Sequence, residues 1–189
     1  LGTMALAVAC AFPLLHVASA AAAPVPSQRQ DEVIDPPGRV GRIADVQGTV
    51  WLFHPEDGEW IAAERNRPLT SGDRLATDGN GRTEVHLGST TLRLDGGSEI
   101  EVLRLDDDNL ALQLHGGSVA ARLRSSEQAR GFELRTGEGR FTVQRTGRYR
   151  FDRRDENSFV TVETGQAYYE AQGSALSVNA GQRAEFWMD

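Results

Sequence analysis

The sequence predicts an all-β fold, and three observations support this prediction. After residue 39, apolar and polar residues alternate over short stretches, such as Leu92-Arg93-Leu94 and Phe132-Glu133-Leu134, and a period of two is that of a strand with one buried face. Glycine turns separate these stretches, and Gly72-Asp73 is the clearest of them. No window of about twelve residues carries the 3.6-residue period of a helix, and the only helix-friendly piece, Ser125–Arg130, is too short to stand alone.

Length and composition fit one domain with a leader. The chain has 189 residues, of which 39% are hydrophobic, and this is enough for a buried core. The formal net charge of −7 argues against a nucleic-acid-binding surface, because such a surface must be basic to bind phosphates. The single cysteine, Cys10, lies in the apolar leader, so we expect no disulfide and no thiol chemistry in the mature domain.

Residues 1–23 are expected to be a signal peptide. The run is rich in Ala, Leu and Val, and the small residues Ala18 and Ala20 suit signal peptidase, so cleavage is predicted near Ala20 or Ala23. The predicted location is the bacterial periplasm or the cell exterior, with no membrane span after cleavage. A retained anchor is the alternative, because the run approaches the ~20 apolar residues that span a bilayer, although Pro13 interrupts it.

Residues 24–38 read as a Pro-rich linker, and the folded domain is predicted to span residues 39–187. Pro36-Pro37 marks the boundary, because proline cannot donate a hydrogen bond to a sheet. Residues 55–58 form a hairpin signal, with strands expected on both sides. The strand expected at 99–105 changes its alternation at Val102-Leu103, which predicts a β-bulge.

A weak repeat occupies the C-terminal half of the chain. Leu112–Val119, Val160–Ala167 and Leu176–Arg183 share the form apolar-x-apolar-x-x-Gly-x-x. Each copy reads as a strand, a glycine turn and the start of the next strand, so Gly117, Gly165 and Gly181 are expected to supply positive φ angles or close backbone approach. Such repeats favour a roll or a short β-helix, and a sandwich is the alternative arrangement.

The turns and strands, taken in order, resemble the FecR-type periplasmic domain over residues 39–187. The matching motifs are Gly48-Thr49-Val50, Leu69-x-x-Gly72-Asp73-x-Leu75-x-Thr77, Val85-x-Leu87, Leu92-x-Leu94-Asp95-Gly96-Gly97-Ser98, Leu112-x-Leu114-x-x-Gly117-Ser118-Val119, Phe132-x-Leu134-x-Thr136, Phe141-x-Val143, Tyr149-x-Phe151, Val160-x-Val162-x-x-Gly165-Gln166-Ala167 and Leu176-x-Val178-x-Ala180-Gly181-Gln182. The resemblance implies a β-rich, roll-like domain outside the cytoplasm that contacts other proteins in envelope signalling.

No set of residues predicts catalysis, a cofactor or a metal site. Asp73 lies in a Gly-Asp turn, where its carboxylate is expected to accept backbone hydrogen bonds and fix the turn. The acidic run at 106–109 lacks the ligand spacing of a calcium loop and reads as a solvated turn. His54, His86 and His115 are far apart in sequence and read as surface residues. We therefore predict that the protein is not an enzyme.

Two groups of residues are candidates for an interaction surface. The aromatic candidates are Trp51, Phe53, Trp60, Tyr168 and Tyr169, because exposed aromatics mark binding sites; core packing is the alternative for them. The basic candidates are Arg148 and Arg150, which share one face of a strand, and their alternative is neutralisation by nearby acids such as Glu163.

The predicted function is that of a non-enzymatic exported interaction module, sensory or scaffolding, that contacts an envelope protein. A carbohydrate or cell-wall binding module is one alternative, and it would use Trp51, Trp60 and the Tyr168-Tyr169 pair. A membrane-anchored anti-sigma regulator is the other, and it would require that the leader is retained.

Overall fold

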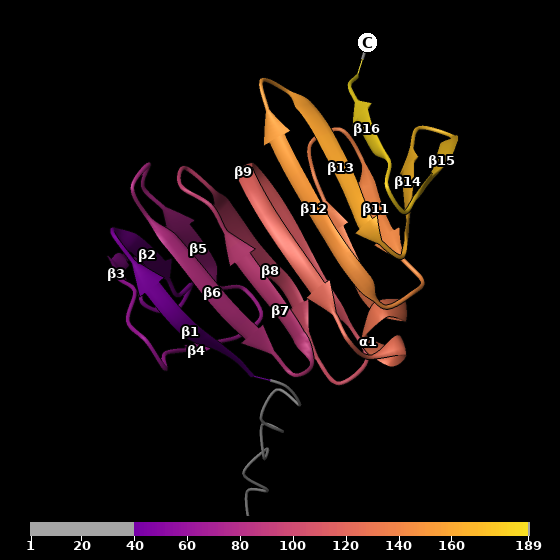
Figure 1. Ribbon diagram of the computed structural model, residues 1–189. Coiled ribbons are helices and arrows are strands. Elements are labelled where there is room, and N and C mark those ends of the chain that lie inside the picture. Colours follow the sequence, from indigo (N-terminus) through magenta and orange to yellow (C-terminus); the bar gives the residue numbers. More distant parts are fainter. Residues whose placement is uncertain (1–39, 189) are drawn as a thin grey trace, which may run out of the picture. The chain divides into compact units, whose positions relative to one another are not determined.

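The computed structural model describes residues 40–188, which form two layers of β-strands joined by one long strand (Figure 1). The fold is all-β, as the sequence predicts. The expected signal peptide at 1–23 and linker at 24–38 lie outside the described residues. Within residues 40–188, no helix has the length and apolar character needed to cross a bilayer.

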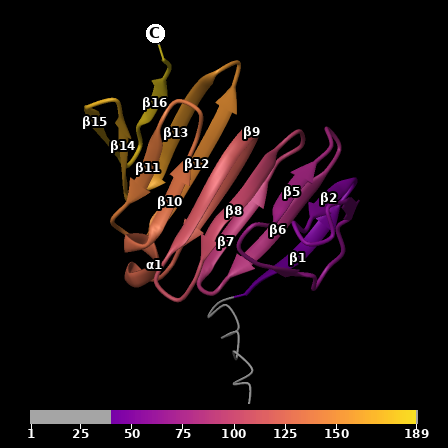
Figure 2. The ribbon, with the colours of Figure 1, turned by 180° about the vertical axis from the view of Figure 1, so that it is seen from behind.

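One layer, which we name sheet A, contains eight strands with antiparallel pairing throughout. In spatial order they are β4 (Pro68–Leu69), β1 (Gly41–Gln47), β6 (Arg82–Leu87), β7 (Thr90–Leu94), the second half of β9 (Leu110–Leu123), β12 (Gly147–Arg154), β13 (Asn157–Thr164) and β16 (Arg183–Phe186). The other layer is seen in front when the domain is viewed from behind (Figure 2).

This second layer, sheet B, contains nine strands. In spatial order they are β3 (Trp60–Ala62), β2 (Val50–Phe53), β5 (Arg74–Thr77), β8 (Glu99–Leu105), the first half of β9, β10 (Phe132–Arg135), β11 (Arg140–Val143), β14 (Gln166–Ala171) and β15 (Ser174–Asn179). All its pairs are antiparallel except β9 with β10, which is parallel. The helix-friendly piece forms α1 (Ser126–Arg130), which connects β9 to β10 and is capped by the Ser125 hydroxyl.

Positive-φ glycines mark many of the places where the chain passes between the sheets. They are Gly48, Gly72, Gly97, Gly117, Gly165 and Gly181. Each copy of the C-terminal repeat contains one such passage: the bend inside β9, the step from β13 to β14, and the step from β15 to β16. The repeat therefore encodes the corners of a two-layer roll, and its glycines have the positive φ angles that the sequence predicts.

Some of these corners also need glycine for space. A Cβ atom at Gly117 would overlap the Cα atom of Ser98, and one at Gly165 would overlap the hydroxyl of Tyr149. The predicted bulge in β8 is confirmed, since the β8–β9 register shifts between Val102 and Arg104.

Alternation within the strands places one face of each sheet in a shared core. The inward residues of sheet A include Val85, Leu92 and Phe151, and those of sheet B include Leu112 and Phe141, all of them buried. Phe151 contacts Phe141 across the two layers, with a ring-centroid distance of 5.4 Å. The burial of both inner faces leaves the two outer faces and the strand edges as the surfaces open to a partner.

Asp73 lies at the corner between β4 and β5 and is buried. Its Oδ2 atom accepts hydrogen bonds from the backbone N–H of Thr70 (2.7 Å) and from the Thr70 hydroxyl (3.1 Å), and its Oδ1 atom lies 2.7 Å from Nδ1 of His54. Gly72 N–H donates to the carbonyl of Val102 at 2.7 Å, so the corner is also tied to β8. His54 thus belongs to a structural contact and is not the free surface residue that the sequence suggested.

We expect Asp73→Ala to lower the free energy of unfolding by about 1–3 kcal/mol, because it removes the buried carboxylate that accepts hydrogen bonds from the N–H and the hydroxyl of Thr70. Urea denaturation of the two proteins measures the difference. The matched control is Asp107→Ala, which removes an exposed aspartate from a turn and should leave the denaturation midpoint unchanged. Equal midpoints for the wild-type and Asp73→Ala proteins would contradict this role.

Candidate interaction surfaces

Three aromatic side chains gather on the outer face of sheet B near its β3 edge, and we name them the aromatic surface: Trp51, Phe53 and Trp60. Phe53 pairs with Trp60 across β2 and β3, with ring centroids 5.4 Å apart. The two tryptophans remain open to solvent, with exposed fractions of 36% for Trp51 and 40% for Trp60. Core packing therefore does not account for these residues, although both faces of β2 are apolar.

Polar neighbours hold these rings in fixed positions. Trp51 donates its indole N–H to Oδ1 of Asp78 at 3.2 Å. The guanidinium of Arg74 lies 5.5 Å from the ring centre of Trp60, where a cation–π attraction is expected, and it also forms an ion pair with Glu99. These contacts restrain the orientations of the two tryptophan rings.

Tyr168 and Tyr169 do not form a surface pair, and this corrects the sequence prediction. Successive side chains on a strand point to opposite faces. Tyr168 is half-buried on the outer side of β14, whereas Tyr169 points into the core, stacks on Phe186 at 3.7 Å and donates its hydroxyl to the carbonyl of Glu138. Tyr169 is consequently a core residue.

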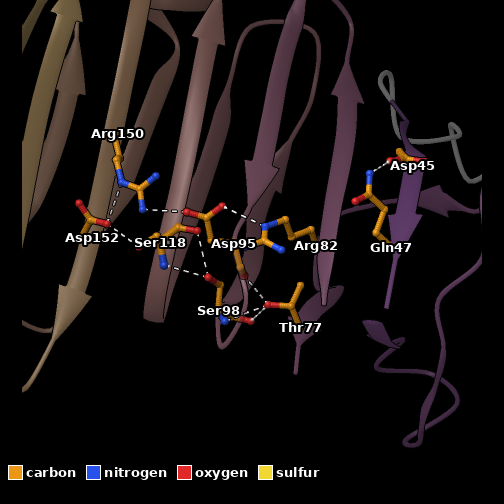
Figure 3. A network of polar contacts seen from close by, with 9 residues as sticks. All are labelled: Asp45, Gln47, Thr77, Arg82, Asp95, Ser98, Ser118, Arg150 and Asp152. Carbon is orange, nitrogen blue, oxygen red and sulfur yellow. Dashed lines mark hydrogen bonds and ion pairs between the residues drawn. The ribbon is translucent and has the colours of Figure 1, made fainter. Parts of the chain in front are cut away.

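Arg150 belongs to a polar network that spans both sheets (Figure 3). Its Nε donates to Oδ1 of Asp152 at 3.0 Å and its Nη2 to Oδ2 of Asp95 at 2.8 Å. Burial lowers the pKa of Arg150, but the hydrogen bonds and charges of Asp95 and Asp152 outweigh burial and raise its pKa above the ordinary value. Arg150 is thus held by two carboxylates, which is the neutralised state that the sequence analysis kept as its alternative.

The same network anchors the corner between β7 and β8. Asp152 is buried and accepts a hydrogen bond from the Ser118 hydroxyl. The backbone N–H of Ser118 donates to the Ser98 hydroxyl (2.8 Å), and the backbone N–H of Ser98 donates to the hydroxyl of Thr77 (2.9 Å). Figure 3 shows this chain of contacts running from β12 to β5. Its role is to hold the layers together.

Arg148 lies in a different setting on the outer face of sheet A. Its Nε is 3.0 Å from Oε2 of Glu163, and both side chains are largely exposed. With Arg93, Arg122 and Arg124 it lines a hollow of about 280 Å³. Arg122 and Arg124 were missed by the sequence analysis. Their alternation with Leu123 signals outward positions, but only the pairing of β9 with β12 brings Arg122 opposite Arg148.

The buried side chain of Glu138 forms an ion pair with Arg153, and the sequence analysis missed this pair as well. The guanidinium of Arg153 donates to both carboxylate oxygens of Glu138, at 2.8 and 3.1 Å, and to the carbonyl of His115 at 2.8 Å. Burial raises the pKa of Glu138, but hydrogen bonds from Arg153 and Ser158 outweigh it, so the pKa lies below its ordinary value. Glu138 is therefore ionised in the folded protein.

The remaining candidates have structural partners. His86 lies 2.6 Å from Glu84, and His115 lies 3.0 Å from Glu101. Asp106 accepts hydrogen bonds from the side chains of Asn109 and Arg104 and from two backbone N–H groups of its turn, and these hold its pKa at about 2. Among residues 40–188, no three His, Cys, Asp or Glu side chains are grouped closely enough to hold a metal ion.

The domain is therefore an all-β roll of two layers, and each layer carries a candidate interaction surface on its outer face. The chain belongs to the FecR family: the family model described as FecR protein matches residues 73–183. This confirms the resemblance drawn from the ordered motifs. No curated protein matches the chain in sequence.

Solved structures support the fold. Two crystal structures of a candidate anti-sigma factor from Parabacteroides distasonis ATCC 8503, at 1.65 Å and 2.50 Å resolution, each superpose with a TM-score of 0.51 at 16% and 17% identity. Each match covers 59% of this chain and 53% of the other, so the chain spans about half the length of the structures that it matches. At this identity the likeness shows the fold alone.

Proposed function

We propose that this protein is a non-enzymatic, exported module of the bacterial cell envelope that acts as a sensor or scaffold through contact with another protein. Its membership of the FecR family and its fold, which it shares with a candidate anti-sigma factor, support a role in signal regulation. The aromatic surface is the observation that carries the proposal.

The aromatic surface has the composition of a protein-binding centre. Tryptophan is enriched among the residues that contribute most to protein–protein affinity, and two tryptophans here are more than a third exposed. The hydrogen bond from Trp51 to Asp78 fixes one ring in advance, which reduces the entropy lost on binding.

The neighbouring strand offers a backbone contact as well. Among the described strands, β3 pairs only with β2, so its other edge presents free N–H and C=O groups. An extended segment of a partner can add to such an edge by main-chain hydrogen bonds, while its side chains contact the exposed rings. The proposed mode of contact is therefore strand addition at β3 with the aromatic surface as the anchor.

Site-specific crosslinking in cells tests this proposal. A photo-crosslinking residue is introduced at Ala62, which is exposed and pairs with Trp51. We expect one discrete crosslinked envelope protein, which should disappear when Trp51→Ser and Trp60→Ser are combined. The matched control is Trp187→Ser, an exposed tryptophan beyond β16, which should leave the crosslink intact. The absence of a product that depends on Trp51 and Trp60 would overturn the proposal, and cell fractionation tests export separately.

A further inference from the structure

The outer face of sheet A is hollowed where β7, β9 and β12 lie side by side. The hollow has a volume of about 280 Å³, just below the roughly 300–1,000 Å³ found for small-molecule sites. Its shape follows from side-chain size: Ala120 and Thr91 are short, while the arginines that surround them are long. A floor of small residues inside a wall of long ones leaves room for a ligand.

The wall carries more positive than negative charge. Four arginines (Arg93, Arg122, Arg124 and Arg148) face two glutamates (Glu84 and Glu163), which leaves an excess of two positive charges in a protein whose net charge is −7. Glu84 pairs with Arg93 at 2.6 Å and Glu163 with Arg148 at 3.0 Å. The side chains of Arg122 and Arg124 form no ion pair or hydrogen bond with any residue in the described part of the chain.

The position of Arg122 beside Arg148 is electrostatically unfavourable when no anion is bound between them. Arg122 on β9 is directly opposite Arg148 on β12 in the register of sheet A. Like charges at such cross-strand positions repel each other, because their Cβ atoms are only about 5 Å apart. An anionic group between Arg122, Arg124 and Arg148 would replace this repulsion by charge-assisted hydrogen bonds.

The glutamates and the threonine restrict what that ligand can be. Carboxylates at Glu84 and Glu163 accept hydrogen bonds from hydroxyl groups, and Thr91 can donate or accept one. The same carboxylates repel a ligand of dense negative charge. The hollow therefore suits a molecule with one anionic group and several hydroxyl groups, which is the chemistry of an acidic sugar.

A second hollow extends the first one. It has a volume of about 470 Å³, continues past the end of β9 towards Thr146 and Thr164, and shares Arg122, Arg124 and Arg148 with the first. A ligand longer than one sugar unit can follow this path along the surface.

We propose that these two hollows form a binding site for an acidic saccharide, in which Arg122 and Arg124 bind the carboxylate or phosphate and Glu84, Glu163 and Thr91 bind ring hydroxyls. The site lies on sheet A, whereas the aromatic surface lies on sheet B. A variant can therefore lose saccharide binding and keep the proposed protein contact, or the reverse.

Isothermal titration calorimetry of the protein at low salt tests the site with four probes: galacturonate, glucose 6-phosphate, neutral maltotriose and inorganic phosphate. We expect the two acidic sugars to bind more tightly than inorganic phosphate, and we expect maltotriose to give no binding signal. Comparison of the two acidic sugars shows whether the site prefers a carboxylate or a phosphate group. Combining Arg122→Ala with Arg124→Ala should weaken acidic-sugar binding at least about tenfold, since a hydrogen bond to a charged group contributes about 1.5–3 kcal/mol.

Two further variants distinguish binding of the sugar ring from non-specific binding of an anion. Ala120→Leu fills the floor without changing charge, so it should abolish sugar binding and leave weak phosphate binding in place. Arg135→Ala removes an exposed arginine of sheet B and is the matched control, with binding unchanged. The proposal is overturned if the Arg122/Arg124 double variant, folded by circular dichroism, binds as the wild type does, or if inorganic phosphate binds as tightly as the acidic sugars.

Discussion

Replacing Arg153 with alanine is expected to lower the free energy of unfolding by about 3–5 kcal/mol, because it leaves a buried carboxylate without its counter-charge. The Glu138 side chain is 1% exposed, and Arg153 supplies two of its hydrogen bonds. Arg153 lies on β12 of sheet A, whereas Glu138 lies in the loop between β10 and β11 of sheet B. The variant therefore breaks a contact that joins the two layers. Chemical denaturation followed by tryptophan fluorescence measures the effect.

The neighbouring residue supplies the control. Arg154 is 63% exposed and lies 3.8 Å from Asp152, so Arg154→Ala should change stability by at most about 1 kcal/mol. A double variant, Arg153→Met with Glu138→Leu, removes both charges and should be more stable than Arg153→Ala, because no buried charge is left unpaired. Similar losses for Arg153→Ala and Arg154→Ala would show that the buried pair does not determine stability.

The strands could be predicted because the pattern that marks a strand lies within a few consecutive residues. Alternation of apolar and polar residues, as in β7 and β10, follows from the strand period and needs no knowledge of distant contacts. The bulge in β8 was visible for the same reason, since one extra residue shifts the phase of the pattern. The glycines of the repeat were also visible, but their function as corners between two sheets depends on which strands pair, and the sequence does not state this.

The surfaces were only partly predictable because they depend on register. The exposure of Trp51 and Trp60 results from their place near the β3 edge, where the outer face of the sheet is not covered by another layer. Arg122 and Arg148 are 26 positions apart in the sequence, and only the β9–β12 pairing places them opposite each other. Tyr168 and Tyr169 are adjacent on β14, so their side chains point to opposite faces of the sheet and only one of them can lie on the outer face.

The second large effect is expected in the core, where Phe151→Ala should lower the free energy of unfolding by about 3–5 kcal/mol. Phe151 is fully buried on β12, and its ring contacts Phe132 (5.9 Å) and Phe141 (5.4 Å) of the opposite sheet as well as Tyr149 (6.4 Å) beside it. Removing the ring leaves a cavity between the layers that these rigid neighbours cannot fill, because each is held by its own strand.

The matched control is Phe159→Ala on β13, the strand that pairs with β12. Phe159 is half-buried on the outer face, where its ring contacts Arg183 at 4.8 Å, so its removal opens no cavity between the sheets and should cost about 1 kcal/mol or less. Thermal denaturation of both variants decides between two descriptions of the fold. A much larger loss for Phe151→Ala means that cross-layer packing stabilises the roll. Equal losses would mean that pairing within each sheet is sufficient, and that the two layers contribute to stability independently.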